Sequence, residues 1–295
     1  MLERVINNLL LSDCGAQHSE MLQLSKGNPR TSLVYLTILT AFASALLDNV
    51  TTILLAIPMT LIVCQYLKVT PIPFILVQVF ASNIGGAATL IGDPPNIIIA
   101  SKANLSFVWF LEHMAPVAFL TLFLMIPIWL FMFRKDLKND SSAREAILKL
   151  DAKSRITDVT LTIKSLSVLA AVLLAFGFHT VLHVEPAVIA LFGAGILVAI
   201  SGLKPKDYVA DIEWSTLVFF IGLFIMVGSL VNVGALGNFA QFLKEVFGDN
   251  IPLAAFSILG ISAVVSGIVD NIPYVASMTP VVGEFVYLVS TTALS

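Results

Sequence analysis

Two acidic dipeptides in apolar surroundings are the residues best suited to chemistry in this sequence. Asp48 with Asn49, and Asp270 with Asn271, each stand between two apolar segments. A carboxylate at membrane depth is costly unless it is protonated, paired or hydrated, so such a residue indicates an ion or proton site by default. The alternative is that each Asp or Asn caps the helix that follows, by accepting from its free N–H groups. We expect both roles.

The two dipeptides belong to an internal repeat. Residues 44–58, SALLDNVTTILLAIP, and residues 266–280, SGIVDNIPYVASMTP, share Ser, Asp, Asn and Pro at the same spacing, with an offset of 222 residues. Apolar residues stay in step between the Ser and the Asp. Paired interruptions at corresponding positions of two halves are typical of secondary transporters, whose binding sites lie at the repeat interface.

A third polar stretch, SNIGGAATLIGDPPN at residues 82–96, interrupts a long apolar run. Its three glycines permit a helix to unwind, and its two prolines are expected to keep the unwound backbone out of a helix until Asn96. Irregular backbone at membrane depth is tolerated only where it is buried in protein or lines a wet cavity. Such a break presents carbonyls to a cation and N–H groups to an anion. The alternative is a loop outside the membrane between two separate helices.

Composition places these motifs in a bilayer. Apolar residues make up 58% of the chain and charged residues 12%, which is too few to give a soluble domain a polar surface. We therefore predict an all-α polytopic membrane protein that contacts membrane lipid. The net charge of −3 gives no reason to expect a nucleic-acid partner. A nucleotide-binding GxxxxGK[ST] loop is absent, so ATP would have to come from a partner subunit. The chain is not predicted to be an enzyme.

Apolar segments and charged stretches predict the following organisation. A cytoplasmic lead-in (1–30) precedes a first repeat (31–133), a basic linker (134–162) and a second repeat (163–295). The first repeat contains a hairpin (32–67), a broken helix (71–101) and a helix (107–133). The second contains three helices (163–182, 186–201 and 214–231) and a hairpin (252–293). Because a full crossing takes about 20 residues, both hairpins are predicted to be re-entrant.

Basic residues predict the orientation. Residues 134–164 hold eight of the sixteen Lys and Arg residues, so this loop is predicted to be cytoplasmic. An odd number of crossings then separates the two hairpins, and the repeat is predicted to be inverted. For a bacterial protein the location would be the plasma membrane.

At these residues the chain resembles the ion transporter superfamily of citrate and dicarboxylate carriers, arsenite permeases and sodium/proton antiporters. LLDNVTT, SNIGGAATLIGDPPN, IEWSTLVFF and VDNIP all resemble the branch of the melanosomal P protein and its bacterial permease relatives. The resemblance runs from about Gly27 to the C-terminus.

The resemblance implies a substrate and ion site where a hairpin tip meets a broken helix. The first tip would be formed by Asp48, Asn49, Thr51 and Thr52, and the second by Asp270 and Asn271. The facing break would comprise Ser82, Asn83, Gly85, Gly86, Thr89, Gly92, Asp93 and Asn96. A sodium ion, if it is the coupling ion, would lie at Asn49, Ser82, Asn83 and Thr89. No other cofactor is expected.

Two departures from the family pattern bear on function. Carboxylate carriers of the superfamily typically read Ser-Asn-Thr at both tips, whereas both tips here read Asp-Asn, which argues against assuming a dicarboxylate. The offset of 222 residues also places the second broken helix at about 304 to 318, beyond Ser295. The family would have further helices before Ser32 as well. We therefore expect a version of a larger carrier that is truncated at both ends and lacks the second broken helix.

The leading prediction is a secondary active transporter of a small anion or oxyanion, coupled to protons or sodium and working by alternating access. A homodimer is one option for its assembly. The alternatives are a sodium/proton antiporter, a truncated fragment that does not transport, and an intramembrane aspartyl protease that uses Asp48 and Asp270 as a dyad.

Overall fold

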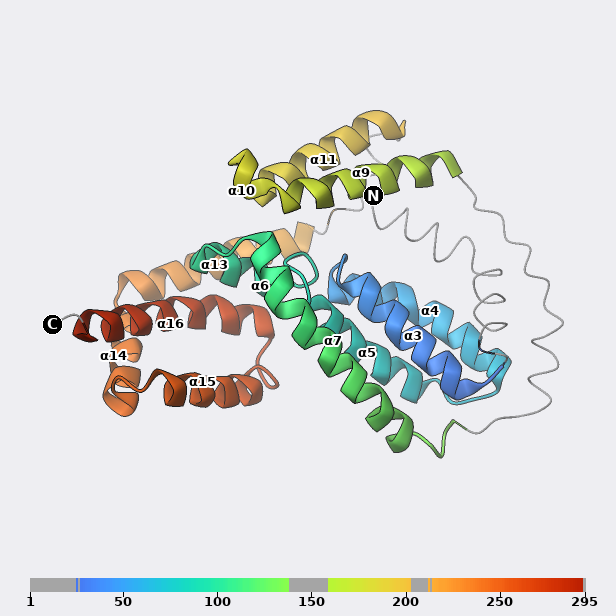
Figure 1. Cartoon of the computed structure of the whole chain (residues 1–295), viewed down its shortest axis with the longest axis horizontal. Coiled ribbons are helices and arrows are strands. Elements are labelled where there is room, and N and C mark those ends of the chain that lie inside the picture. Colours follow the sequence, from blue (N-terminus) through green and yellow to red (C-terminus); the bar gives the residue numbers. More distant parts are fainter. Residues whose placement is uncertain (1–24, 26, 138–158, 203–211, 213, 294–295) are drawn as a thin grey trace. The chain divides into compact units, whose positions relative to one another are not determined.

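The computed structural model describes residues 25, 27–137, 159–202, 212 and 214–293 (Figure 1). Most of the predicted lead-in (1–30) and most of the basic linker (134–162) lie outside the described residues. The chain forms two compact units, residues 1–93 with 106–211, and residues 94–105 with 212–295. Each unit therefore combines segments of both predicted repeats.

The first unit is built around a helical hairpin. Its arms are α3 (Pro29–Ser44) and α4 (Asn49–Leu67), and both pack against α5 (Ile72–Gly86). The long helix α7 (Phe107–Met132) covers another side of α5. The unit also holds α9 (Val159–Gly177), α10 (His179–Leu182) and α11 (Pro186–Ser201), of which α9 and α11 form an antiparallel pair.

The second unit contains the other hairpin, with arms α15 (Ile251–Val265) and α16 (Asn271–Ala293). It also contains α6 (Pro94–Ala103), α13 (Trp214–Asn232) and α14 (Ala235–Phe247). Here α16 is the central element, because α6, α13 and α14 all pack against it. The second half of the first broken helix therefore lies beside the second hairpin.

Helix starts follow the repeat seen in the sequence. The arms α3 and α15 begin at residues 29 and 251, and α4 and α16 begin at residues 49 and 271, so the offset is 222 residues in both cases. The side chain of Asn28 caps α3 and that of Asn250 caps α15, each by accepting a backbone N–H. Interior prolines, Pro58 and Pro280, recur at the same offset, and each removes one helical hydrogen bond.

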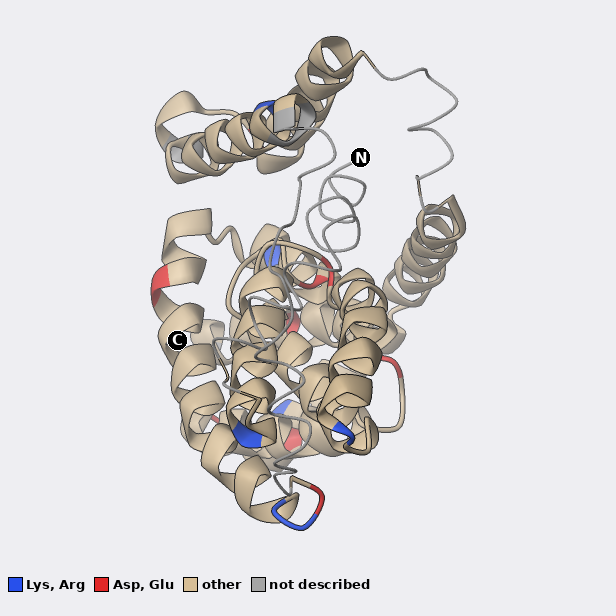
Figure 2. Cartoon of the chain, turned by 90° about the vertical axis from the view of Figure 1, so that its right-hand side faces the viewer, with Lys and Arg blue, Asp and Glu red and all other residues tan. Residues whose placement is uncertain are grey.

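Apolar packing holds each unit together. In the first unit Phe74, Val77 and Trp129 belong to one cluster of buried residues from α3, α4, α5 and α7. Trp129 also stacks on Phe80, with ring centroids 6.0 Å apart. In the second unit Leu243 of α14 packs with Val281 of α16. Figure 2 shows how few charged residues the described helices carry, so the surface that these cores leave exposed is largely apolar.

Within the part of the chain that the structure describes, four helices are long and apolar enough to cross a membrane: α4, α7, α13 and residues 271–291 of α16. The predicted all-α polytopic class is confirmed, and no strand occurs among the described residues. The predicted helices at 186–201 and 214–231 agree closely with α11 and α13. Because α4 has 19 residues and α16 has 23, the second arm of each hairpin is longer than a short re-entrant segment needs. The re-entrant course and the inverted orientation stay predictions.

Helix α14 is an element that the sequence pattern did not predict. Its apolar residues gather on one face of the helix and its polar residues on the other, so it contains no continuous apolar run by which the sequence would reveal it. Ala240 and Leu243 face the core of the second unit, and Lys244 Nζ donates to the carbonyl of Leu288 over 2.6 Å. The amphipathic α14 is thus held against α16, the second arm of the second hairpin.

Candidate functional site

The first hairpin tip is the turn of residues 45–48. Asp48 is the N-cap of α4, and its Oδ2 accepts from the backbone N–H of Thr51 over 3.0 Å. The capping role predicted for this residue is therefore confirmed, and it uses one of the two carboxylate oxygens. Asp48 and Asn49 are both half-buried at the tip. Their predicted role in ion binding stays a prediction.

The break in the long apolar run is confirmed. Helix α5 ends at Gly86 and α6 begins at Pro94, so residues 87–93 are not helical. The hydroxyl of Thr89 organises this segment, because it accepts from Ile91 N over 3.2 Å and from Gly92 N over 3.1 Å. The same hydroxyl donates to the carbonyl of Ala45 over 2.5 Å. One donor and two acceptor positions are all that a hydroxyl has, so sodium at Thr89 would displace one of these bonds.

The structure brings the tip and the break together within the first unit. Besides the bond from Thr89 to Ala45, Ser44 Oγ donates to the carbonyl of Ser82 over 2.7 Å. Asn49 Nδ2 donates to Asn83 Oδ1 over 3.0 Å. Sequence reasoning did not place Ser44 in the site, although the signal was available, since Ser44 recurs as Ser266 in the repeat.

The three glycines of the break have a packing role besides the predicted unwinding. Gly85 and Gly86 are the last two residues of α5, and Gly92 lies in the non-helical segment that follows. A Cβ on Gly85 would collide with the backbone carbonyl of Ala41 in α3. A Cβ on Gly92 would lie 2.5 Å from the carbonyl oxygen of Ser44. The glycines therefore permit close approach of the hairpin backbone and the broken helix, because no side chain stands between them.

The position of the two prolines in the structure also differs from the prediction. Pro94 and Pro95 were expected to keep the backbone out of a helix until Asn96, but they are the first two residues of α6. Proline is favoured in the first turn because its missing N–H would have no helical partner there. The consequence is chemical, since α6 begins without two of the N–H groups that a helix start usually offers to an anion.

The remaining predicted residues lie in different surroundings. Thr52 is 3% exposed and lines a cavity inside the hairpin. Asn96 is buried on α6, in the second unit. Asp270 caps α16 through a bond of 2.9 Å from the N–H of Ile272 to its Oδ1, which confirms the capping alternative at the second tip. Asn271 is the first residue of α16 and is half-buried.

The charges around the first tip favour a cation over an anion. Asp48 places a carboxylate at the start of α4, where it offsets the positive end of that helix. The C-terminal, negative end of α5 lies at the same place, as the Asn49 to Asn83 bond shows. Neither motif contains Lys, Arg or His. No cluster of three or more His, Cys, Asp or Glu occurs in the described ranges.

The described residues combine several apolar helices with a repeated pair of capped hairpins and a broken helix that is joined to one hairpin tip. Together these features define a multi-pass integral membrane protein of the transporter class. The chain belongs to the citrate transporter family (CitMHS), which matches residues 17–293. The predicted relation to the ion transporter superfamily and the P protein branch is confirmed by this match together with the relatives below.

Among curated proteins, an uncharacterised transporter of Mycobacterium bovis is 47% identical over 262 residues, which cover 89% of this chain and 61% of that protein. An uncharacterised transporter of Synechocystis is 28% identical, over 91% of this chain and 60% of its own length. The P protein of Sus scrofa is 30% identical, over 88% of this chain and 40% of its own length. The chain thus spans about three-fifths of the length of these bacterial relatives.

Proposed function

We propose that this chain is part of a secondary active transporter in which the first hairpin tip and the facing break hold the coupling ion. The observation that carries the proposal is the junction of tip and break, where three hydrogen bonds join Ser44, Asn49 and Ala45 to the broken helix beside the carboxylate of Asp48. Alternating access by movement of one repeat against the other is the mechanism that this architecture supports.

The coupling ion is a proton or sodium. A proton would reside on Asp48, whose carboxylate needs neutralisation at membrane depth. Sodium would be held by oxygens of Asp48, Asn49 and the carbonyls at the end of α5. Carbonyls at the C-terminal end of a half-helix are the groups that coordinate sodium in discontinuous membrane helices.

The substrate of the full-length protein is proposed to be a small anion or oxyanion. The citrate transporter family and the transporter names of the bacterial relatives support this class. Because no basic residue lies in either the hairpin-tip motifs or the break, the anion would be bound through the coupling cation.

A sodium/proton antiporter is the second candidate. The specific observation that favours it is the charge at the first tip, where a carboxylate cap and a helix C-terminus converge without a basic residue in the motif. Such a site binds cations without needing an anion.

Flux into proteoliposomes by the full-length protein distinguishes these functions. Small anions are screened against imposed proton and sodium gradients, with empty vesicles as the control. Anion uptake that requires one of the gradients supports the carrier. Proton release driven by sodium in the absence of any anion supports the antiporter, and no flux under all gradients contradicts both.

A further inference from the structure

The two hairpins differ in the side chains at one pair of corresponding positions on their arms. In the second hairpin Ser262 of α15 and Tyr274 of α16 are hydrogen bonded through their hydroxyls over 2.8 Å. The offset of 222 residues places Thr40 of α3 and Thr52 of α4 at the corresponding positions of the first hairpin. Two threonines occupy less space than a serine and a tyrosine, and the position of the Tyr274 ring therefore has no equivalent side chain in the first hairpin.

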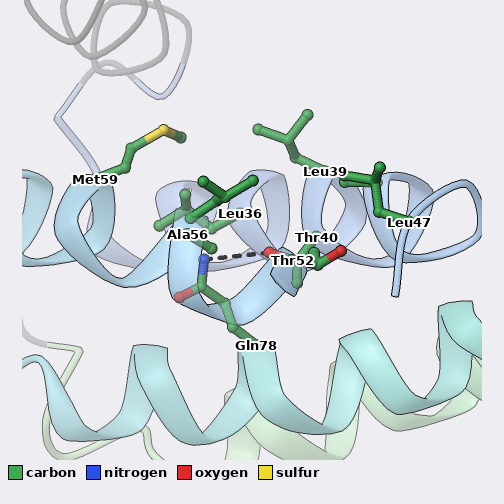
Figure 3. Close-up of a pocket in the computed structure, with 10 residues that line it drawn as sticks. Leu36, Leu39, Thr40, Leu47, Thr52, Ala56, Met59 and Gln78 are labelled. Atoms are coloured by element: carbon green, nitrogen blue, oxygen red, sulfur yellow. Dashed lines mark hydrogen bonds between the residues drawn. The ribbon is translucent and has the colours of Figure 1, made fainter. Parts of the chain in front are cut away.

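A cavity of about 40 Å³ lies in the first hairpin at this level, between α3, α4 and α5 (Figure 3). Its polar lining residues are Thr40, Thr52 and Gln78, and the other seven are Leu, Ala or Met. A water molecule needs about 10 to 15 Å³ by the same measure, so the cavity has room for water. No carboxylate lines it, which makes it unsuited to a metal cation.

The hydroxyl of Thr52 has no hydrogen-bond partner among the described residues, although the residue is 3% exposed. Threonine in a helix often satisfies its hydroxyl by donating to the carbonyl four residues earlier. Thr37 does so, over 2.7 Å. Thr52 does not, and a buried hydroxyl without a partner is expensive.

The other two polar residues have hydrogen-bonding capacity to spare. Gln78 Nε2 donates to Thr40 Oγ1 over 3.2 Å, and Thr60 Oγ1 donates to Gln78 Oε1 over 2.7 Å. These bonds leave the second N–H of Gln78 and the O–H of Thr40 available. A buried water typically makes about three hydrogen bonds, and Thr52, Thr40 and Gln78 can supply them.

We propose that the cavity is a water site, at which a water molecule bridges Thr52 to Thr40 and Gln78 and takes the place that the Tyr274 hydroxyl has in the second hairpin. The water links the arm that begins at the tip to α5, the helix that carries the break. The two hairpins of the repeat therefore differ in how their arms are joined: a water molecule bridges the arms of the first, and a direct bond between the hydroxyls of Ser262 and Tyr274 joins those of the second.

The sign of a stability change tests this proposal. Thr52→Val keeps the shape of the side chain and removes its hydroxyl. If the hydroxyl binds a water, the variant loses a hydrogen bond. The Tm of the full-length variant in detergent then falls below that of the unmodified full-length protein. If the hydroxyl has no partner, removing it relieves a buried polar group, so an unchanged or raised Tm overturns the proposal.

Ser32→Ala provides a matched control, because Ser32 Oγ is also buried without a partner among the described residues but does not line the cavity. Its removal is expected to leave Tm unchanged or to raise it. Should Thr52→Val fail to fold, an experimental structure of the unmodified protein at a resolution that shows waters decides. Density within hydrogen-bond distance of Thr52 Oγ1 supports the site, and a cavity without density overturns it.

Discussion

Asn49 Nδ2 donates to Asn83 Oδ1 over 3.0 Å, and this bond joins the first residue of α4 to the last turn of α5. Asn83 in turn donates from Nδ2 to the carbonyl of Val79 over 3.1 Å, which orients its amide with the oxygen toward the tip. The Oδ1 atom of Asn49 takes no part in this bond. The two amides thus couple the tip to the break, and the Asn49 amide does so through its nitrogen alone.

The charge of Asp48 can be separated from its capping role. Asn is as good an N-cap as Asp, so Asp48→Asn removes the charge and keeps the bond to Thr51 N. We expect ion-driven flux to be abolished while the amount of protein in the membrane and its Tm stay close to those of the unmodified protein. Proteoliposome flux and thermal unfolding measure the two properties.

Asp249→Asn is the matched control, because Asp249 is an exposed residue of the second unit outside both motifs. It should leave flux unchanged. Asp48→Ala, by contrast, should lose flux and also about 1 kcal/mol of stability, since alanine cannot cap the helix. Normal flux in the Asp48→Asn variant would show that this carboxylate does not bind the coupling ion.

The amide pair should act as a unit. Asn49→Ala and Asn83→Ala each break the same bond, so their effects on the free energy of unfolding should not add. We expect a coupling energy of about 0.5 to 1 kcal/mol, at the low end for a hydrogen bond because Asn83 is exposed. Unfolding of both single variants and the double variant in detergent measures it. Strict additivity would show that the bond contributes nothing.

Close approach at Gly85 should tolerate no side chain. Gly85→Ala places a Cβ against the carbonyl of Ala41, and neither backbone can yield without moving the hairpin from α5. We expect a loss of about 3 kcal/mol or more, the upper range for overpacking. Gly222→Ala in α13 is the control, since a Cβ there would meet no atom of another described segment within 4 Å, and it should be neutral or stabilising by up to about 1 kcal/mol. Equal stability of the two variants would contradict the packing at Gly85.

The hydroxyl of Thr89 should matter more than its methyl group. Thr89→Val leaves the N–H groups of Ile91 and Gly92 and the carbonyl of Ala45 without this partner, at a cost of about 1 to 3 kcal/mol for a buried group left unpaired. Thr89→Ser keeps all three bonds and should stay near the stability of the unmodified protein. Thermal unfolding of the two variants checks the difference. A Thr89→Val variant as stable as Thr89→Ser would show that the hydroxyl does not hold the break.

Much of the fold and the location of the site could be predicted from local signals. Apolar runs gave α7, α11 and α13, because a helix in a bilayer must be apolar over its length. The amphipathic α14 was missed for the same reason, since burial of one face requires no apolar run. The roles predicted for Pro94 and Pro95 were wrong, because proline, which interrupts a helix in its interior, is favoured in its first turn.

The sequence by itself determined the membrane class, the two Asp-Asn tips, their repeat and the position of the break, since each follows from the residue types within short segments or from a match between two such segments. Only the tertiary structure decided what the side chains do. It placed the side chain of Thr52 in the wall of a cavity rather than at the break, and it placed Gly85 against the backbone of Ala41. It also packed α6 beside α16. Those outcomes depend on distances between segments far apart in sequence, which are set by the packing of whole helices and not by local pattern.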